Sequence, residues 1–345
     1  MFGNRSERGP MRLLWIGNGY FYSELPACGW DTTHYCNPRD FRVFGWKELV
    51  AEAGFEPDVL LVVDKSSCPY VLGMEDFPCL TVFYAIDSHL QSWYPLYAQG
   101  FDVTLLSLRD HLPRFVGEFL PAERIFWSPP CVPGNFRPSG DMPDKEWDCL
   151  FAGTVNANTP GRAAFLAELG KHLPGLHIAR GDFGQLFPRG RVLLNICENA
   201  DLNFRVFEAL AMGGCLLTPD IGHGQGDLFQ DGVHLTLYRQ NDVQDALAKI
   251  QALLADAPRR ERLGKAGLAE IDAHHRACHR AATFTSHMLP LLAQKDAIVS
   301  ARRARAADIR QHCLKLSYLL WAQEMPDAKV KEQYLAAASG HFQSL

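Results

Sequence analysis

The stretch "NFRVFEALAMGGCLLTP", residues 203–219, contains the elements that decide the fold. Asn203 is a good helix N-cap, and the apolar residues that follow it predict a short helix. Gly213 and Gly214 end this helix and allow it to pack closely, and "CLLTP" predicts a buried strand. A helix followed at once by a buried strand is typical of α/β proteins with a parallel sheet.

The same alternation of apolar strands and amphipathic helices runs along the chain from about residue 11 to residue 240. The predicted strands are residues 12–17, 58–64, 79–87, 102–107, 124–129, 148–154, 176–181, 191–196, 215–219 and 234–238. The predicted helices are residues 46–54, 110–120, 160–173, 203–213 and 241–271. The fold class is therefore α/β, with two Rossmann-like, doubly wound parallel sheets in series and no sequence repeat between them.

A proline-rich stretch without periodicity, residues 128–148, separates the two halves. We expect, in chain order, a flexible leader, a Rossmann-like domain, a linker, a second Rossmann-like domain and a helical segment, over residues 1–10, 11–130, 131–147, 148–275 and 276–345. The helical segment either packs on the core or begins an interaction module for a protein partner or a second copy.

Composition excludes several classes of protein. A net charge of −5 gives no general attraction to nucleic acid. No apolar run reaches the roughly 18–20 residues of a membrane span, and "MFGNRSERGP" does not resemble a secretory signal. The ten cysteines include no C-x-x-C pair, and several lie in apolar runs, so we expect reduced thiols and a cytoplasmic protein.

One histidine-rich stretch raises the question of a metal. "HHRACH" places His275 and His279 one helical turn apart, with Cys278 between them. No acidic residue or further histidine follows nearby, so a histidine-rich helix surface is favoured over a metal site.

Ligands of parallel sheets bind beyond the carboxyl ends of the strands, so the residues after each predicted strand are the candidates for a site in a cleft between the two sheets. Gly17 and Gly19 follow the first strand, in "GNGYF". The third glycine of a dinucleotide-binding motif is missing, which argues against a nicotinamide enzyme. These glycines would instead let the backbone approach a sugar or an acceptor.

Asp87 and His89 leave the buried strand 79–87 together, in "AIDSHLQSW", and are the candidate catalytic pair. In the alternative interpretation Asp87 caps the next helix and His89 is hydrogen-bonded inside the protein.

In the second half, Gly153 and Thr154 follow the strand 148–154, and Arg162 comes shortly after them. Arg180 and Gly181 end the strand 176–181. Arginines at successive strand ends suit a phosphate group, because the guanidinium presents a planar fork of donors.

The opening stretch supplies the remaining candidates. Behind the cap residue Asn203, the backbone N–H groups of Phe204 and Arg205 are available to an anion at the helix N-terminus. Glu208 lies one turn further, where its carboxylate suits the two hydroxyls of a ribose. The alternative is a surface ion pair between Arg205 and Glu208, worth about 0.2–0.5 kcal/mol.

The segment "NFRVFEALAMGGCLLTPDIGHGQGDLFQDGVHLTLYR" closely resembles the C-terminal motif of CgeB-like (spore-maturation type) glycosyltransferases, relatives of the family-4 GT-B enzymes. "FYAIDSHLQSWYPLYAQGFDVTLLSLRDHLPRF" and "PPCVPGNFRP" resemble the N-terminal half and the linker of that group. The resemblance covers roughly residues 55–285 and is absent beyond about residue 295.

This resemblance implies the GT-B architecture, with a nucleotide-sugar donor held mainly by the second domain and the acceptor by the first. It implies transfer without a metal and usually with retention of configuration. Glu208 matches the ribose-binding glutamate, Arg205 the diphosphate site, and Asp87 with His89 the donor-sugar and catalytic contacts. Ala200 departs from the family pattern, because a second glutamate normally stands there.

We therefore expect a cytoplasmic hexosyltransferase that needs no metal or prosthetic group. Its donor is a UDP-sugar in preference to a GDP- or dTDP-sugar, and its acceptor is a hydroxyl of a glycan, a lipid-linked glycan or a protein. The alternatives are a nucleotide-sugar epimerase of GT-B fold, which would consume its substrate without an acceptor, and a non-catalytic scaffold that binds a partner through the helical segment.

Overall fold

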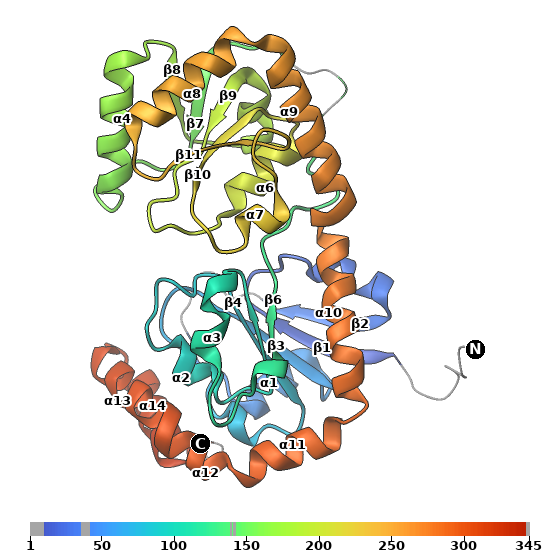
Figure 1. Ribbon diagram of the computed structural model, residues 1–345. Coiled ribbons are helices and arrows are strands. Elements are labelled where there is room, and N and C mark those ends of the chain that lie inside the picture. Colours follow the sequence, from blue (N-terminus) through green and yellow to red (C-terminus); the bar gives the residue numbers. More distant parts are fainter. Residues whose placement is uncertain (1–9, 36–41, 139, 141–142, 343–345) are drawn as a thin grey trace, which may run out of the picture. The chain divides into compact units, whose positions relative to one another are not determined.

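The computed structural model describes residues 10–35, 42–138, 140 and 143–342. All of the expected leader except Pro10 lies outside the described residues, as do residues 139, 141 and 142 of the expected linker. The chain divides into two compact units (Figure 1). Unit 1 combines residues 1–129 with residues 281–345, and unit 2 contains residues 130–280.

Within the described residues, unit 1 contains a six-stranded, wholly parallel sheet in the order β2-β1-β3-β4-β5-β6. Its strands are β1 (Met11–Ile16), β2 (Trp30–Tyr35), β3 (Val59–Val63), β4 (Leu80–Ala85), β5 (Val103–Leu106) and β6 (Ile125–Trp127). The central strands are mostly apolar because both faces of the sheet are covered: every residue of β3, β4 and β5 is buried.

Two predictions for unit 1 were wrong. The strand β2 was not expected, because an edge strand of sequence WDTTHY is partly exposed and has no apolar run. The helix expected over 110–120 shrinks to α3 (Leu112–Phe115). Buried Gln99 explains this, since its amide donates to the Phe115 carbonyl at 2.9 Å and accepts from the Leu120 amide at 3.1 Å, which holds residues 115–120 in a loop.

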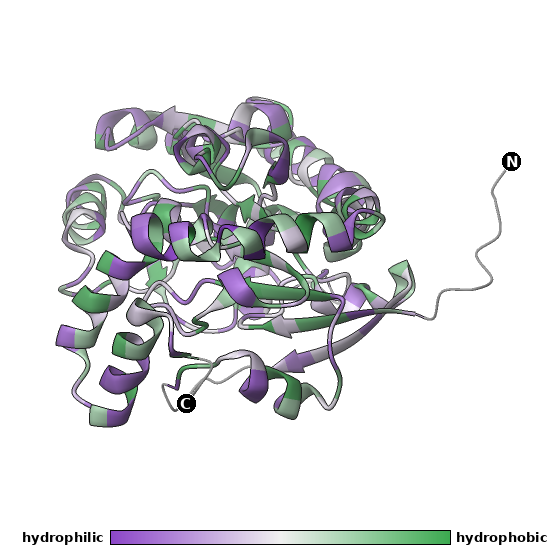
Figure 2. Ribbon diagram, turned by 90° about the horizontal axis from the view of Figure 1, so that it is seen from below, coloured by the Kyte–Doolittle hydropathy of each residue, from purple (hydrophilic) through white to green (hydrophobic). Residues whose placement is uncertain are grey.

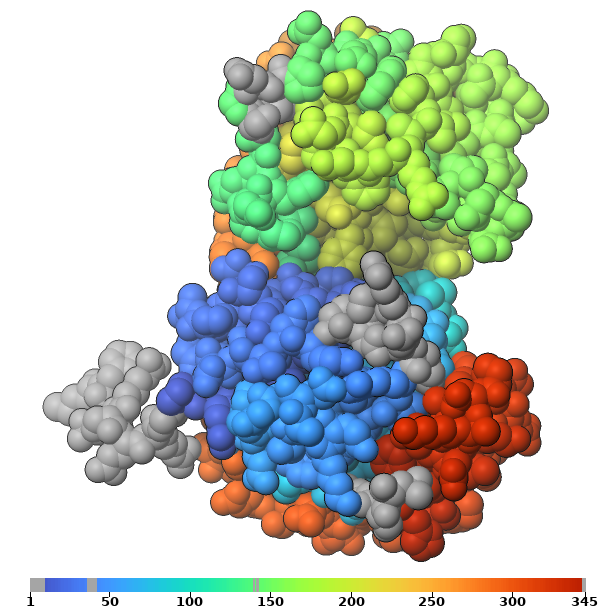
Figure 3. Space-filling view, turned by 180° about the vertical axis from the view of Figure 1, so that it is seen from behind, coloured from blue at the N-terminus to red at the C-terminus, as the bar shows by residue number. Residues whose placement is uncertain are grey.

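The C-terminal helices belong to unit 1. Ile309, Leu314, Tyr318 and Tyr334 are buried in the same core as the strands. Figure 3 shows these red helices against blue N-terminal residues of the same unit, and in Figure 2 the helices carry both hydrophilic and hydrophobic residues. The helices of unit 1 are α1 (Trp46–Ala53), α2 (Tyr94–Ala98), α3, α11 (Lys295–Ala304), α12 (Ala306–Ile309), α13 (Lys315–Glu324) and α14 (Ala328–Ser339).

A buried arginine fixes this C-terminal segment. Arg302 of α11 pairs with Asp102, which directly precedes β5, and both side chains are almost fully buried. The same guanidinium donates to the Thr81 hydroxyl at 2.9 Å and to the Cys79 carbonyl at 3.1 Å. A buried charge requires such a set of partners, so α11 is an integral part of unit 1.

Unit 2 contains, among its described residues, a five-stranded parallel sheet in the order β11-β10-β9-β7-β8. Its strands are β7 (Trp147–Ala152), β8 (Leu176–Ala179), β9 (Gly190–Leu194), β10 (Leu216–Asp220) and β11 (Thr236–Arg239). Its helices are α4 (Pro160–His172), α5 (Phe183–Leu186), α6 (Phe204–Ala211), α7 (Gln225–Leu228), α8 (Val243–Ala255) and α9 (Ala257–Glu270), and α10 (Ala277–Leu292) begins in this unit. The single helix expected over 241–271 is divided, because the Asp256 carboxylate accepts the Arg259 amide at 2.9 Å and starts α9 anew.

Candidate functional site

The stretch 203–219 folds as α6, a tight turn and β10, as expected. Arg205 and Glu208 form no ion pair with each other. The Arg205 guanidinium instead donates to the Asn195 side-chain oxygen at 2.9 Å. Asn195 follows β9 directly and is fully buried, so it holds the arginine at the carboxyl end of the sheet. The surface ion pair is therefore not what the structure contains.

Asn203 occupies the N-cap position of α6, but its side chain does not cap the helix. Its side-chain oxygen accepts from the Asn195 amide at 3.3 Å, and that amide also donates to the Thr218 hydroxyl at 3.1 Å. Asn195 is thus the centre of a buried polar network joining β9, β10 and α6. Sequence reasoning missed it, although it stands directly behind an apolar strand.

A second arginine lies beside the first. Arg162 of α4 donates to the Thr154 carbonyl at 2.8 Å, and its guanidinium lies 5.8 Å from the centre of the Phe151 ring. The Arg205 guanidinium lies 5.3 Å from the same ring. Burial, followed by the charge of Arg162, lowers the pKa of Arg205. The Nε atoms of both arginines are buried and have no hydrogen-bond partner among the described residues.

Two half-buried guanidinium groups with unpaired N–H donors are suited to bind an anion. Three carboxylates lie near them: Glu198, 3.9 Å from Arg162, and Glu208 and Asp201, whose charges act on Arg205. Glu198 is already occupied, because it accepts the Gly161 amide at 2.9 Å and so caps α4. The Nε donors of the two arginines nevertheless remain without a partner among the described residues.

Gly153 must be a glycine for this arrangement to exist. A Cβ atom at this position would lie 2.8 Å from the Arg205 Nη2 atom and 3.2 Å from the Phe151 ring. The close approach of the guanidinium to the end of β7 therefore requires the missing side chain.

Glu208 is half-buried, one turn into α6. Burial raises the pKa of its carboxyl, and the charge of Arg205 partly opposes this rise. Within the described residues its carboxylate makes no hydrogen bond. Ala200, at the departure from the family pattern, adopts a left-handed backbone with φ of 56°.

The other predicted residues of unit 2 are less closely joined to this group. Phe204 is half-buried in the first turn of α6, whereas Arg180 and Gly181 are exposed after the edge strand β8. In the described part of the chain Arg180 makes no hydrogen bond or ion pair, and no contact joins it to Arg162 or Arg205. Arg162 and Arg205 thus form an arginine cluster, and Arg180 does not belong to it.

In unit 1, Gly17 has φ of 103°, and a Cβ atom there would lie 2.9 Å from the Tyr70 hydroxyl. Its carbonyl accepts from the His34 Nε2 atom at 2.7 Å. Backbone conformation and packing thus explain Gly17 without a ligand. Gly19 is exposed, and a Cβ atom there would lie 3.2 Å from the His34 ring.

Asp87 and His89 follow β4 as expected, and both are half-buried. The Asp87 carboxylate accepts a hydrogen bond from the Ser66 hydroxyl rather than capping a helix. The Nδ1 atom of His89 is buried without a partner among the described residues, so His89 is not a hydrogen-bonded core histidine through that atom. Sequence reasoning missed Asp64, which follows β3 and accepts the Asp87 amide at 2.9 Å.

His275 lies in a buried position against Phe207 and Phe229, 3.6 Å from Glu270. Burial, followed by the charge of Arg280, lowers the pKa of His275 to about 3. The expectation of a histidine-rich surface was therefore wrong for His275, which packs in the interior of unit 2.

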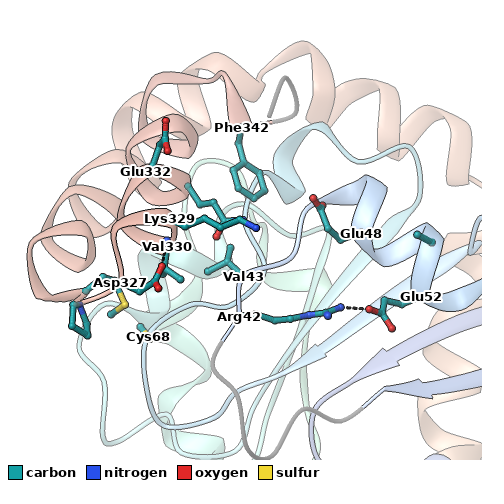
Figure 4. A pocket seen from close by; sticks show the side chains of 14 residues that line it. Arg42, Val43, Glu48, Glu52, Cys68, Asp327, Lys329, Val330, Glu332 and Phe342 are labelled. Carbon is teal, nitrogen blue, oxygen red and sulfur yellow. Dashed lines mark hydrogen bonds and ion pairs between the residues drawn. The ribbon is translucent and has the colours of Figure 1, made fainter.

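A separate hollow in unit 1 is lined by α1, α14 and the residues between β2 and α1 (Figure 4). Its charged side chains largely serve the local structure: Glu48 accepts the Gly45 amide at 3.0 Å, Glu52 pairs with Arg42, and Asp327 accepts the Val330 amide at 2.9 Å.

Comparisons with known proteins agree with this reading of unit 2. Residues 145–286, which include Arg162 and Arg205, match a protein family described as "Glycosyl transferase-like". No curated protein sequence matches the chain.

Solved structures define the fold as GT-B. HepE of Anabaena, solved with UDP and glucose, is similar with a TM-score of 0.58 at 11% identity, over 81% of this chain and 99% of that one. Sucrose-phosphate synthase of Thermosynechococcus elongatus gives a TM-score of 0.58 at 12% identity, over 82% and 99%. A glycosyltransferase of Rickettsia africae ESF-5 gives 0.55 at 8% identity, over 81% and 98%.

None of the helices in the described residues is both long and apolar enough to span a membrane. The nine cysteines of these residues are all free thiols.

Proposed function

We propose that this protein is a glycosyltransferase that moves a sugar from a UDP-sugar to a hydroxyl acceptor. The observation that carries the proposal is the pair of half-buried arginines, Arg162 and Arg205, which retain unpartnered donors at the carboxyl end of the unit 2 sheet. The glycosyl transferase-like sequence of this domain supports it. HepE, whose fold is similar, was solved with UDP and glucose, which favours UDP over GDP or dTDP.

In this proposal the diphosphate of the donor lies against Arg162, Arg205 and the start of α6. When the sugar is transferred, the oxygen of the acceptor hydroxyl bonds to C1, the bond between C1 and the diphosphate oxygen breaks, and the electron pair leaves with the diphosphate, which takes up the hydroxyl proton. Fixed cations in a half-buried site stabilise this developing negative charge without reorganisation. The buried hydrogen bond to Asn195 keeps Arg205 in position for this role.

Glu208 is proposed to hold the ribose of the donor. Its carboxylate has no hydrogen bond among the described residues, and a carboxylate can accept both hydroxyls of a ribose. Glu198 does not replace the glutamate that family-4 relatives carry at the position of Ala200, because its carboxylate caps α4. Recognition of the sugar itself therefore depends on other groups.

Further features belong to the same proposal. Hexosyl transfer with retention follows from the family resemblance, and proton NMR of the first-formed product tests it. Metal independence follows from the arginines, and activity should survive EDTA. The acceptor is a hydroxyl of a glycan, a lipid-linked glycan or a protein, and the free thiols support a cytoplasmic location.

Calorimetry with two ligands, UDP and uridine, tests the donor site. Arg205→Ala should lower the affinity for UDP at least about tenfold and leave the affinity for uridine nearly unchanged, because uridine has no phosphate. Glu208→Gln should weaken both ligands to a similar degree, because both contain the ribose.

Two control variants keep the test specific. Arg260→Ala removes a half-buried arginine at the start of α9 that donates to the Leu253 carbonyl, and Glu168→Gln removes an exposed carboxylate on α4. Both controls should bind UDP like the wild type. Unchanged affinities in the Arg205 and Glu208 variants would refute the proposed donor site.

A further inference from the structure

The helix α13 is apolar on two opposite faces. Tyr318 and Ala322, on one face, are buried in the core of unit 1. Leu316, Leu319 and Leu320, on the other face, are 66%, 36% and 54% exposed. Spacings of three and four residues place these leucines side by side on the helix surface. A helix that is apolar on both faces is normally covered on both, so the outer face of α13 indicates a missing partner.

This outer face, Leu316 with Leu319 and Leu320, is called the α13 leucine face below. Two of its members, Leu316 and Leu320, are the most exposed large apolar side chains of the described residues. The helix packs against α14 on the surface of unit 1, where Figure 3 shows both in red. Single exposed leucines are ordinary, whereas a contiguous group of them marks an interaction surface.

The sequence left open whether the C-terminal helical segment packs on the core or serves as an interaction module. The helix α13 packs on the core with the face of Tyr318. Its leucine face is not covered by any of the described residues. One helix therefore combines both expected roles.

Opposite charges stand at the two ends of α13. Lys315 is its first residue and Glu324 its last, and exposed Asp327 follows at the same end as Glu324. The Lys315 ammonium donates to the Gln311 side chain at 3.1 Å, and within the described residues neither Lys315 nor Glu324 has an ion-pair partner. The carbonyl groups at the carboxyl end of the helix add partial negative charge there.

This pattern is complementary to itself. When two copies of α13 lie antiparallel about a two-fold axis, the positive end of each helix comes beside the negative end of the other. The middle of α13 falls between Leu319 and Leu320, so the leucines of both copies meet at the axis. A membrane with anionic lipids fits less well, because it would repel Glu324 and Asp327.

We propose that the α13 leucine face is the contact between two copies of this chain, which form an antiparallel, two-fold dimer. A single face of a ten-residue helix makes a small interface, so the dimer is weak and reversible. The inference concerns unit 1 alone and is independent of the proposed function, because neither donor nor acceptor takes part in the contact.

Sedimentation equilibrium of the full chain tests the leucines, at protein concentrations from about 1 to about 500 μM. The mass of the wild type should rise from that of one chain toward that of two. Leu316→Ser and Leu320→Ser should each raise the dissociation constant of the dimer at least about tenfold. Leu289→Ser is the matched control, because this leucine is 44% exposed on α10, outside the α13 leucine face, and the variant should dimerise like the wild type.

Charge reversal tests the antiparallel arrangement. Lys315→Glu makes both ends of α13 negative and Glu324→Lys makes both positive, so each variant alone should dimerise more weakly than the wild type. An equal mixture of the two variants should associate again, because each end then meets its opposite. The double variant with both changes should also dimerise, since its ends are exchanged but remain opposite.

Several results would overturn the proposal. A wild type that stays monomeric over the whole concentration range is one, and leucine variants that dimerise like the wild type are another. A mixture of the charge variants that associates no better than either alone would contradict the antiparallel pairing. Vesicles of phosphatidylcholine and phosphatidylglycerol address the membrane alternative: a monomeric wild type that sediments with them, and loses this in Leu320→Ser, would assign the leucine face to a lipid surface instead.

Discussion

Substitution of Gly153 by alanine tests the geometry of the arginine cluster without removing a charge. The backbone at Gly153 is not left-handed, so alanine adds no backbone strain there. Its Cβ atom, however, would lie 2.8 Å from the Arg205 Nη2 atom. Either the guanidinium moves, or the hydrogen bond of 2.9 Å that fixes it to Asn195 is distorted.

The magnitude follows from the contact that is lost. A hydrogen bond between charged groups contributes roughly 1.5–3 kcal/mol. Since 1.4 kcal/mol corresponds to a factor of about ten in the dissociation constant, displacement of the Arg205 guanidinium should lower the affinity for UDP about ten- to hundredfold. Uridine should be almost unaffected, because it has no diphosphate to meet Arg205.

Calorimetric titration of UDP and uridine into wild type and Gly153→Ala is the assay. Gly226→Ala is the matched control, because a Cβ atom on Gly226 in α7 of the same unit meets nothing within 4 Å. The control should bind both ligands normally. Arg205 would not be the diphosphate ligand if Gly153→Ala bound UDP with wild-type affinity, or if its affinity for uridine fell as much as its affinity for UDP.

Two further predictions concern unit 1. Arg302→Ala leaves Asp102 buried without its cation and should lower the free energy of unfolding by about 3–5 kcal/mol in urea denaturation. Burial already raises the pKa of Asp102, so this loss of unfolding free energy should shrink on acidification as the carboxyl becomes neutral. The control Arg303→Ala, at an exposed neighbour on α11, should have little effect. An equal loss of stability in both variants would contradict the role of the buried Arg302–Asp102 pair. His89→Ala should lower turnover with little change in melting temperature, since its Nδ1 atom has no protein partner to lose in the described residues, whereas lower stability at full activity would assign His89 to the core.

The alternation of strands and helices could be predicted because parallel strands are buried on both faces. The strand β3 is a continuous apolar run for this reason, β7 and β10 contain shorter apolar runs, and all three were found from the sequence. Edge strand β2 is not buried in this way, so its polar sequence gave no signal. The length of α3 depends on Gln99, a residue of another segment, and such long-range contacts are invisible to local patterns.

The site was predictable in part for a similar reason. The residues Arg205 and Glu208 were found because a strand end and a helix start mark ligand sites in parallel sheets. The partner of Arg205 was not, since Asn195 is ten positions away, on the other side of the loop that joins β9 to α6. In the same way, Asp64 meets Asp87 only because β3 and β4 are neighbours in the sheet.

The most direct test of the central claim, that unit 2 binds a UDP-sugar, is a thermal-shift measurement of the full chain with UDP-, GDP-, dTDP- and CMP-sugars. A ligand at a hundredfold excess over its dissociation constant stabilises the folded protein by about 2.7 kcal/mol. For a chain of this size this corresponds to a rise in melting temperature on the order of 2–4 °C per kcal/mol. We predict such a rise with the UDP-sugar and its loss in Arg205→Ala; a melting temperature that no nucleotide sugar changes would contradict the claim.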